Sequence, residues 1–194
     1  MTDLAIDRKE AWRYLRMGNA EPGAELTARF AAIEDEMLAA IRPAAYWQLV
    51  RVADGGGETY RVGDLELRSE SLRRTLAGCR HAFLFVATLG AGADEVLRKK
   101  SILSGADAMI VQAIATALIE TYCAQCEREM AQEPAAAGER LRLRFSPGYG
   151  DLPLEVQRPL LAALDSTRRA GVVLTDSLLM VPSKSVSAII GVGN

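Results

Sequence analysis

The chain has 194 residues, of which 49% are hydrophobic and 25% charged, and its formal net charge is -2. This balance lacks the excess of Lys and Arg that marks a nucleic-acid-binding surface, and the hydrophobic share is too high for a disordered chain. No uninterrupted apolar run reaches the roughly 18 residues of a membrane span, and the first residues do not form a signal peptide. We therefore expect a cytoplasmic protein of one domain, residues 1–194, that binds neither nucleic acid nor a membrane.

Helices are predicted at the amino-terminal end. Asp7 is a suitable N-cap for a helix over residues 8–17, which Gly18-Asn19 would end. Residues 24–41 place apolar side chains at helical spacing, and Pro43 ends that segment. Residues 1–43 are thus expected to be helical and residues 44–194 to form an α+β core.

The next segments alternate between strand and helix patterns. Strands are predicted over residues 46–52 and 59–67, joined by a hairpin turn in the glycine run 55–57. Ser69 or Ser71 caps a short helix, and the apolar run 81–89 fits a strand that is buried on both faces. A helix over residues 93–103 follows, and Ser104 then caps the longest helix, residues 105–130.

The carboxyl-terminal third mixes the same elements. We expect a loose alanine-rich connection at 134–138, a strand at 141–145, a helix at 153–170 capped by Gly171, and strands at 172–180 and 185–190. Strands and helices do not alternate as regular βαβ units. This favours an α+β fold with an antiparallel β-sheet flanked by helices.

Cysteine and histidine are too few for a metal site or a catalytic triad. A closed zinc site needs four ligands, and the Cys123-x-x-Cys126 pair has only Cys79 and His81 to complete it. Cys79 and His81 are two positions apart in the sequence, and their spacing does not place them beside the cysteine pair. The pair is better interpreted as two small apolar residues one turn apart on a helix, and His81 has no second ionisable partner at a fixed spacing. No metal ligands are therefore predicted.

The segment 144–153 carries the most unusual chemistry. Arg144 ends a strand, and a loop with two prolines and two glycines then leads into a helix. The guanidinium suits a carboxylate, backbone amides near Gly148 suit an anionic or carbonyl oxygen, and the ring of Tyr149 suits a cation or a purine. Carboxylate, cation and purine are the recognition features of S-adenosylmethionine. The alternative is a rigid loop with Arg144 in a surface ion pair.

These motifs resemble a known family. The pattern that carries the resemblance comprises Arg144-x-x-Pro147-Gly148-Tyr149, the segment 171–177, and Met180-Val181-Pro182 with Ser185-Val186-Ser187. It resembles the activation domain of cobalamin-dependent methionine synthase. The resemblance is specific from residue 144 to 187 and weaker from 83 to 130, and it carries no motif before residue 80.

The resemblance implies both a fold and a function. The family has a curved antiparallel sheet and binds S-adenosylmethionine in a groove, while a separate domain presents the cobalamin. It rescues oxidised cob(II)alamin by coupling one-electron reduction, often from a flavodoxin, to methylation. Orientation of the methyl group is the main task of such a protein, so an active site without His or Cys is expected. By this resemblance Arg144 binds the methionyl carboxylate, and Ser146, Gly148 and Tyr149 hold the nucleoside side.

Several positions depart from the family pattern. Members usually continue Gly-Tyr with Pro-x-Cys-Pro, where this chain has Gly150-Asp151-Leu152-Pro153, and they carry a tyrosine pair where it has Ile189-Ile190. An acidic contact to the amino group of the ligand has no aligned counterpart. Glu120 and Asp107, on the long helix, are the candidates to replace it, and a solvated helix flank is the alternative interpretation of Glu120.

Two functions remain open. The first is a stand-alone reactivation subunit that binds S-adenosylmethionine, is not active alone, and acts on a separate cobalamin-binding methyltransferase with a flavodoxin or another one-electron donor. The second is a non-catalytic module of the same fold that binds a ligand or docks onto a corrinoid protein.

Overall fold

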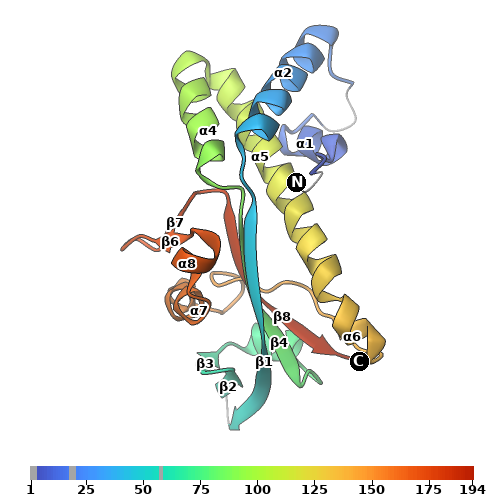
Figure 1. The fold of residues 1–194 in the computed structure, drawn as a ribbon, viewed down its shortest axis with the longest axis vertical. Coiled ribbons are helices and arrows are strands. Elements are labelled where there is room, and N and C mark those ends of the chain that lie inside the picture. Colours follow the sequence, from blue (N-terminus) through green and yellow to red (C-terminus); the bar gives the residue numbers. More distant parts are fainter. Residues whose placement is uncertain (1–3, 18–20, 57–58) are drawn as a thin grey trace.

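The computed structural model describes residues 4–17, 21–56 and 59–194 (Figure 1). Its centre is a six-stranded antiparallel sheet in the order β3-β2-β1-β4-β8-β5. The strands are β1 (Ala44–Gly56), β2 (Thr59–Val62), β3 (Leu65–Arg68), β4 (His81–Thr88), β5 (Arg140–Leu141) and β8 (Ser185–Gly193). A separate hairpin pairs β6 (Val173–Leu174) with β7 (Met180–Val181). The predicted α+β fold with an antiparallel sheet is therefore confirmed.

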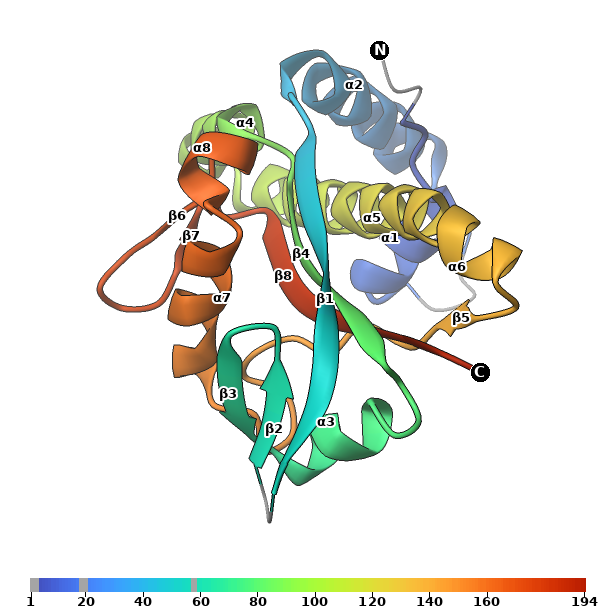
Figure 2. The ribbon, with the colours of Figure 1, turned by 60° about the horizontal axis from the view of Figure 1, so that its bottom comes forward.

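Helices cover both faces of this sheet. On one face α1 (Arg8–Tyr14), α2 (Ala24–Ala40) and α4 (Ala91–Leu103) pack around α5 (Gly105–Met130), and α6 (Gln132–Ala136) continues from its end. On the other face lie α3 (Glu70–Thr75), the 3-10 turn η1 (Leu154–Val156), α7 (Gln157–Ala163) and α8 (Ser166–Ala170). Figures 1 and 2 show α5 and α7 on opposite sides of β8.

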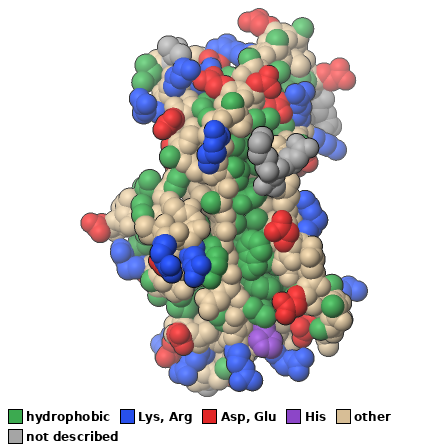
Figure 3. All heavy atoms as spheres, in the orientation of Figure 1, with side chains coloured by type: hydrophobic (Ala, Val, Ile, Leu, Met, Phe, Trp, Pro, Cys, Tyr) green, Lys and Arg blue, Asp and Glu red, His purple; other side chains and the backbone are tan. Residues whose placement is uncertain are grey.

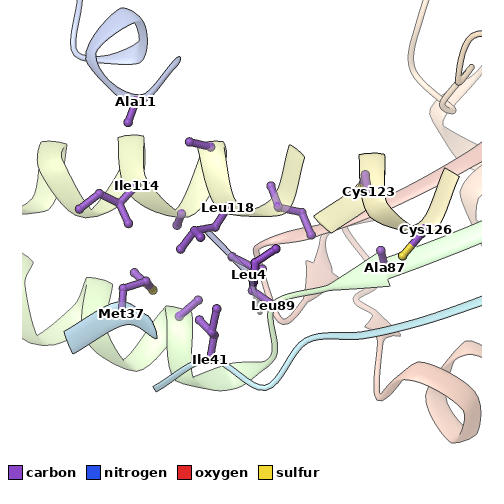
Figure 4. Close-up of a cluster of buried hydrophobic side chains, with 14 of the residues drawn as sticks. Leu4, Ala11, Met37, Ile41, Ala87, Leu89, Ile114, Leu118, Cys123 and Cys126 are labelled. Atoms are coloured by element: carbon purple, nitrogen blue, oxygen red, sulfur yellow. The ribbon is translucent and has the colours of Figure 1, made fainter. Parts of the chain in front are cut away.

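The central strand β4 explains why two cores can form. Its side chains alternate between the faces of the sheet, so Phe83 and Phe85 join the core under α5, while Leu84 and Val86 join the core under α7. The near-continuous apolar sequence of 81–89 thus has a partner on each face, as the sequence predicted. Figure 4 shows part of the first core, where Ile114 and Leu118 of α5 lie near Met37 and Ile41.

Several local predictions are confirmed by the caps. The Asp7 carboxylate accepts a hydrogen bond from the Glu10 amide at the start of α1. Ser69 and Ser104 cap α3 and α5 in the same way, and Gly171 ends α8 with a φ of 67°. Gly18 and Asn19, the expected end of the first helix, and Gly57, in the expected hairpin turn, lie outside the described residues.

Other element predictions were wrong. The expected strand 59–67 is two strands, because the chain turns at Gly63, whose φ is 59°. The alanine-rich segment 134–138 is largely helical in α6, since alanine favours helix and Pro134 falls in the first turn, where no amide donor is needed. The expected strand 172–180 is the hairpin β6–β7.

The helix predicted over 153–170 is broken into three pieces. The break between α7 and α8 lies at Asp165, whose φ of 47° is left-handed. Aspartate tolerates this conformation better than most residues. The apolar stripe alone does not reveal such a break, because Leu160, Leu161 and Leu164 keep helical spacing before it.

The long helix region 105–136 is apolar enough to pass a length and composition test for a membrane span, with a mean hydropathy of 1.2. However, 56% of its most apolar window is buried inside the protein. A core helix passes the same test, so the finding is weak evidence for a membrane. The face in Figure 3 shows Lys and Arg among Asp and Glu at both ends and hydrophobic side chains between them.

Candidate functional site

A groove of about 420 Å³ lies beside β8, between the helices on one face of the sheet and those on the other. One side comes from α5 through Glu120, and the other from α7 and β7 through Gln157 and Met180. The floor and rim come from β8 and from the segment after β5. The residues that line the groove are Glu120, Arg144, Phe145, Ser146, Pro147, Tyr149, Gln157, Met180, Ser185, Val186 and Ser187.

The groove exists because β5 leaves the sheet early. Among the described residues of this edge, only Arg140 and Leu141 pair with β8 as a strand. After them the Arg142 amide donates one hydrogen bond to the Gly191 carbonyl, and Phe145 and Ile189 form an isolated bridge. The expected strand 141–145 is therefore much shorter than the sequence pattern predicted, and no strand of the described residues lies beside the first part of β8 on this edge.

The open edge of β8 presents backbone polar groups to the groove. Ile189 exchanges both backbone hydrogen bonds with Phe145, at 2.8 and 2.9 Å, so its amide and carbonyl point to this edge. Backbone groups point to the same edge at every second residue of a strand. The amides and carbonyls of Ser187 and Ser185 consequently point toward the groove, where they can bind a ligand.

Arg144 is held by two carboxylates of α5. Its Nη2 donates to Glu120 Oε2 at 2.6 Å, and its Nε lies 2.5 Å from Glu127 Oε1. The second contact lacks the angles of a hydrogen bond, so Glu127 Oε1 is buried and has no hydrogen-bond partner among the described residues. The surface ion pair that the sequence left as an alternative is thus present, on an arginine that also lines the groove.

Burial changes the acidity of the residues around this arginine. It raises the pKa of the Glu127 carboxyl above its ordinary value, the charge of Glu120 acts in the same direction, and Arg144 opposes both. Burial also raises the pKa of the Cys123 thiol to about 12. That thiol is therefore protonated at neutral pH and is a poor nucleophile.

The loop from Ser146 to Leu152 is closed by its own backbone. The Gly148 amide donates to the Leu152 carbonyl at 2.9 Å, and the Tyr149 amide donates to the Ser146 carbonyl at 3.2 Å. These two amides are used within the loop, and Gly148, whose φ is 89°, does not line the groove. Tyr149 is 68% exposed and lines the groove. The turn shapes the loop and leaves the ring free to contact a ligand.

Asp151 fixes this loop to a distant part of the chain. Its carboxylate accepts hydrogen bonds from the Ser69 hydroxyl at 2.6 Å and from the amides of Glu70 and Ser71 at 2.7 and 3.1 Å. These hydrogen bonds hold the pKa of Asp151 well below its ordinary value, and the bond from the Ser69 hydroxyl has the largest effect. Asp151, one of the residues that depart from the family pattern, therefore anchors the groove loop to the start of α3.

Four of the five residues predicted for the site are brought together in the groove: Glu120, Arg144, Ser146 and Tyr149. The other acid considered, Asp107, forms an ion pair with Arg29 of α2 and does not line the groove. The ligand-binding roles of these residues, and that of Gly148, stay predictions.

Sequence reasoning missed Gln157 and Glu127. Gln157 shares the apolar stripe of the helix predicted there, since Leu160, Leu161 and Leu164 follow at spacings of three, four and seven. A polar residue in such a stripe is the signal that was available. Glu127 lies two turns after Glu120 on the same face of α5.

The cysteines lie away from solvent. Cys123 and Cys126 belong to the core between α5 and the sheet, where Figure 4 shows them near Ala87, as expected of small apolar residues on a helix. Cys79 is buried and free. Among the described residues, no three His, Cys, Asp or Glu side chains gather in a way that would hold a metal ion.

Comparison with known proteins identifies a family whose matched region contains the groove. The family model described as "Vitamin B12 dependent methionine synthase, activation domain" matches residues 79–193, more than half of the chain and all of the groove. The chain belongs to this family. The predicted resemblance is therefore confirmed.

A solved structure described as "Crystal Structure of the MetH Reactivation Domain bound to AdoHcy" has the same fold, with a TM-score of 0.63. The two chains are 18% identical over 96% of this chain and 73% of that one. At this identity the likeness shows the fold alone. No curated protein sequence matches the chain.

Proposed function

We propose that this activation-domain protein binds S-adenosylmethionine in the groove and supports reductive methylation of cob(II)alamin on a separate cobalamin-dependent methyltransferase of the methionine synthase type. The observation that carries the proposal is the position of Arg144 and Glu120, which lie side by side in the groove within the part of the chain that matches the family. The solved relative is described as bound to AdoHcy, the product of methyl transfer from this compound.

The groove fits such a ligand in size and in charge. Its volume of about 420 Å³ lies within the range of small-molecule sites, about 300–1,000 Å³. We assign the methionyl carboxylate to the guanidinium of Arg144 and the methionyl ammonium to Glu120. The carboxylate then shares Arg144 with Glu127, and Glu120 exchanges its hydrogen bond with Arg144 for one with the ligand.

We assign the nucleoside part of the ligand to the loop from Ser146 to Leu152 and to the open edge of β8. Ser146 lines the groove directly, and Gly148 gives the loop its left-handed turn. The backbone groups of Ser185 and Ser187 are available along the edge of β8. The Tyr149 ring is placed to contact the sulfonium through a cation–π interaction, and its exposure keeps the rim accessible to a second protein.

Little acid–base chemistry is required of this chain. The sulfonium is an activated methyl donor, and one electron from a flavodoxin or another donor converts cob(II)alamin into the nucleophile that takes the methyl group, leaving S-adenosylhomocysteine. The residues of the groove orient the methyl group toward the face where a cobalamin-binding protein docks. A site formed by an arginine, carboxylates and a tyrosine is sufficient for that task.

We further propose that residues 1–194 act as one domain in the cytoplasm, and that the domain is not active alone. The similarity to the solved relative covers 96% of the chain, which includes the helical part that precedes β1. The cobalamin and the methyl acceptor are then supplied by the partner methyltransferase. No role for nucleic acid or a membrane is included in the proposal.

The ion pairs of Arg144 also favour a second candidate. An arginine that is already paired with Glu120 and Glu127 is less available to a ligand carboxylate. A non-catalytic module of the same fold, which docks onto a corrinoid protein without transferring a methyl group, would retain those pairs as structure.

Calorimetric titration of the purified protein with S-adenosylmethionine and S-adenosylhomocysteine tests the proposal. Binding of both ligands is expected. A second assay mixes the protein with a cobalamin-binding methyltransferase that lacks its own activation domain, a one-electron reductant and S-adenosylmethionine, and follows loss of the cob(II)alamin absorbance. Binding to the corrinoid protein without binding of S-adenosylmethionine would reject the first function in favour of the second.

A further inference from the structure

Gln157 is a buried polar side chain that faces the groove without a partner. The residue is only 5% exposed, and it lines the groove from the start of α7. In the part of the chain that the structure describes, its carboxamide makes no hydrogen bond. The amide oxygen and nitrogen of Gln157 are not among the fully enclosed polar atoms, so they remain accessible from the groove to water or to a ligand.

The surroundings of Gln157 differ from those of Arg144. The side of the groove near Arg144 is charged, with Glu120 and Glu127 on α5. Phe145, from the segment after β5, and Met180, from β7, also line the groove, and both pack against the apolar core under α7. Gln157 therefore presents one donor group and one acceptor group at an otherwise apolar wall.

This combination suits the edge of a purine base. A carboxamide places its N–H groups and its oxygen in one plane, and it can pair with both the 6-amino group and an adjacent ring nitrogen of adenine. The phenyl ring of Phe145 and the thioether of Met180, which line the same groove, offer apolar contacts to the face of the base. A methionyl group, in contrast, is matched by the charged side of the groove.

We propose that Gln157 determines the base specificity of the groove by hydrogen-bonding the 6-amino edge of the adenine of S-adenosylmethionine. This inference rests on the proposed function, since it takes the ligand from there. It adds a residue and a contact that neither the family motif nor the ion pairs of Arg144 provide.

The test compares two ligands on the wild-type protein by calorimetry. One is S-adenosylhomocysteine, and the other is its analogue in which hydrogen replaces the 6-amino group of the base. Loss of one neutral hydrogen bond should weaken binding of the analogue roughly 3- to 12-fold. Equal affinities would overturn the role of Gln157. If neither ligand binds, the proposed function itself fails, which is a different result.

Two variants then assign the preference to the side chain. Gln157→Met keeps the length and the unbranched shape of the side chain, and Gln157→Leu serves if the first variant folds poorly. Each should bind the two ligands with affinities equal within about twofold, because no amide is left to contact the 6-amino group. A variant that still prefers the adenine ligand would overturn the proposal.

The melting temperature of the free variants separates a ligand contact from a structural role. Because the amide of Gln157 makes no hydrogen bond within the described part of the protein, its removal should leave the melting temperature of the free protein nearly unchanged. A lower melting temperature together with an unchanged base preference would make Gln157 a structural residue. Arg144→Lys is the matched control, since it should weaken both ligands by the same factor and leave the base preference intact.

Discussion

Replacement of Arg144 by alanine should have two separable effects, one on ligand binding and one on the free protein. The first effect is the loss of a charge-assisted contact with the methionyl carboxylate. Such hydrogen bonds contribute about 1.5–3 kcal/mol, which corresponds to a loss of about 10- to 150-fold in affinity for S-adenosylhomocysteine. Glu120 and Glu127 compete for the same guanidinium, so the lower half of that range is the expected result.

The second effect arises because Glu127 loses its cation. The Glu127 side chain is 33% exposed, burial already raises its pKa, and Arg144 is the group that opposes this rise. Breaking a fully buried pair costs about 3–5 kcal/mol and an exposed pair at most about 1 kcal/mol, so a cost of about 1–2 kcal/mol is expected. In a protein of this size that lowers the melting temperature by about 2–8 °C at neutral pH.

Two control variants separate the effects. Arg144→Lys keeps a positive charge near Glu127, so it should restore most of the stability but not the affinity, because an ammonium does not reproduce a two-pronged contact. Arg144→Ala combined with Glu127→Gln should restore stability by removing the unpaired charge, while binding stays weak. Calorimetry and thermal unfolding of the same samples provide both quantities.

The pH dependence of the stability of the Arg144→Ala variant tests independently whether the lost stability comes from the unpaired Glu127 carboxylate. A carboxyl whose folded pKa is raised above its unfolded value binds more protons in the folded state. The destabilisation should therefore shrink as the pH falls from neutrality toward the unfolded pKa of a glutamate, about 4.3. If affinity is unchanged while stability falls, Arg144 is only a structural ion pair and its role in carboxylate binding is refuted.

The remaining predictions concern the loop, its anchor and the packing of the helices. Tyr149→Ala should weaken S-adenosylmethionine more than S-adenosylhomocysteine, because only the former has a sulfonium, and calorimetry of both ligands would expose an equal loss that rules out a cation–π contact. Asp151→Asn should lower the melting temperature at pH 7, and the difference from wild type should vanish in acid. Because the pKa of Asp151 is lowered in the folded protein, its carboxylate stabilises the fold at pH values above the ordinary aspartate pKa of about 3.9. This stabilisation is lost as the pH falls through the folded pKa. A difference in melting temperature that does not depend on pH would contradict this role of Asp151. Gly92→Ala should destabilise the protein by about 1–3 kcal/mol or more in denaturant unfolding, because the added Cβ would lie 2.1 Å from the Ala40 carbonyl oxygen, and an unchanged midpoint would refute this close approach of α4 and α2.

Most elements of the first two-thirds of the chain, apart from the strand expected over 59–67, followed from local patterns. Capping residues such as Asp7, Ser69 and Ser104 marked helix starts because their side chains satisfy amides that the helix itself leaves free. The strand 81–89 followed from its apolar run, which requires cover on both faces. These signals depend on neighbours in sequence, and the sequence contains them.

The errors lie where the structure depends on distant neighbours or on one backbone angle. β5 ends after two residues although the alternation continues to Phe145, and that early departure opens the edge of β8. The break at Asp165 depends on a single left-handed residue within an otherwise helical pattern. The spacing of apolar residues along the sequence does not reveal one left-handed residue, so it predicted a continuous helix.

The candidate site was partly predictable for the same reasons. Arg144, Ser146 and Tyr149 belong to a contiguous motif, and Glu120 was considered as an acid beside the apolar stripe of a long helix. Gln157 comes from a helix on the other face of the sheet. Only the three-dimensional structure shows that its amide enters the same groove.

The arrangement around Arg144 links ligand charge to proton binding. One guanidinium faces two carboxylates, and the pKa of Glu127 is raised by burial and by the charge of Glu120. S-adenosylmethionine carries one more positive charge than S-adenosylhomocysteine, and a nearby positive charge favours the ionised form of a carboxyl. Binding of the sulfonium ligand should therefore lower the pKa of Glu127, and loss of the sulfonium on methyl transfer should raise it again. By linkage, deprotonation of Glu127 should favour binding of S-adenosylmethionine over S-adenosylhomocysteine, so the ratio of the two affinities should rise with pH.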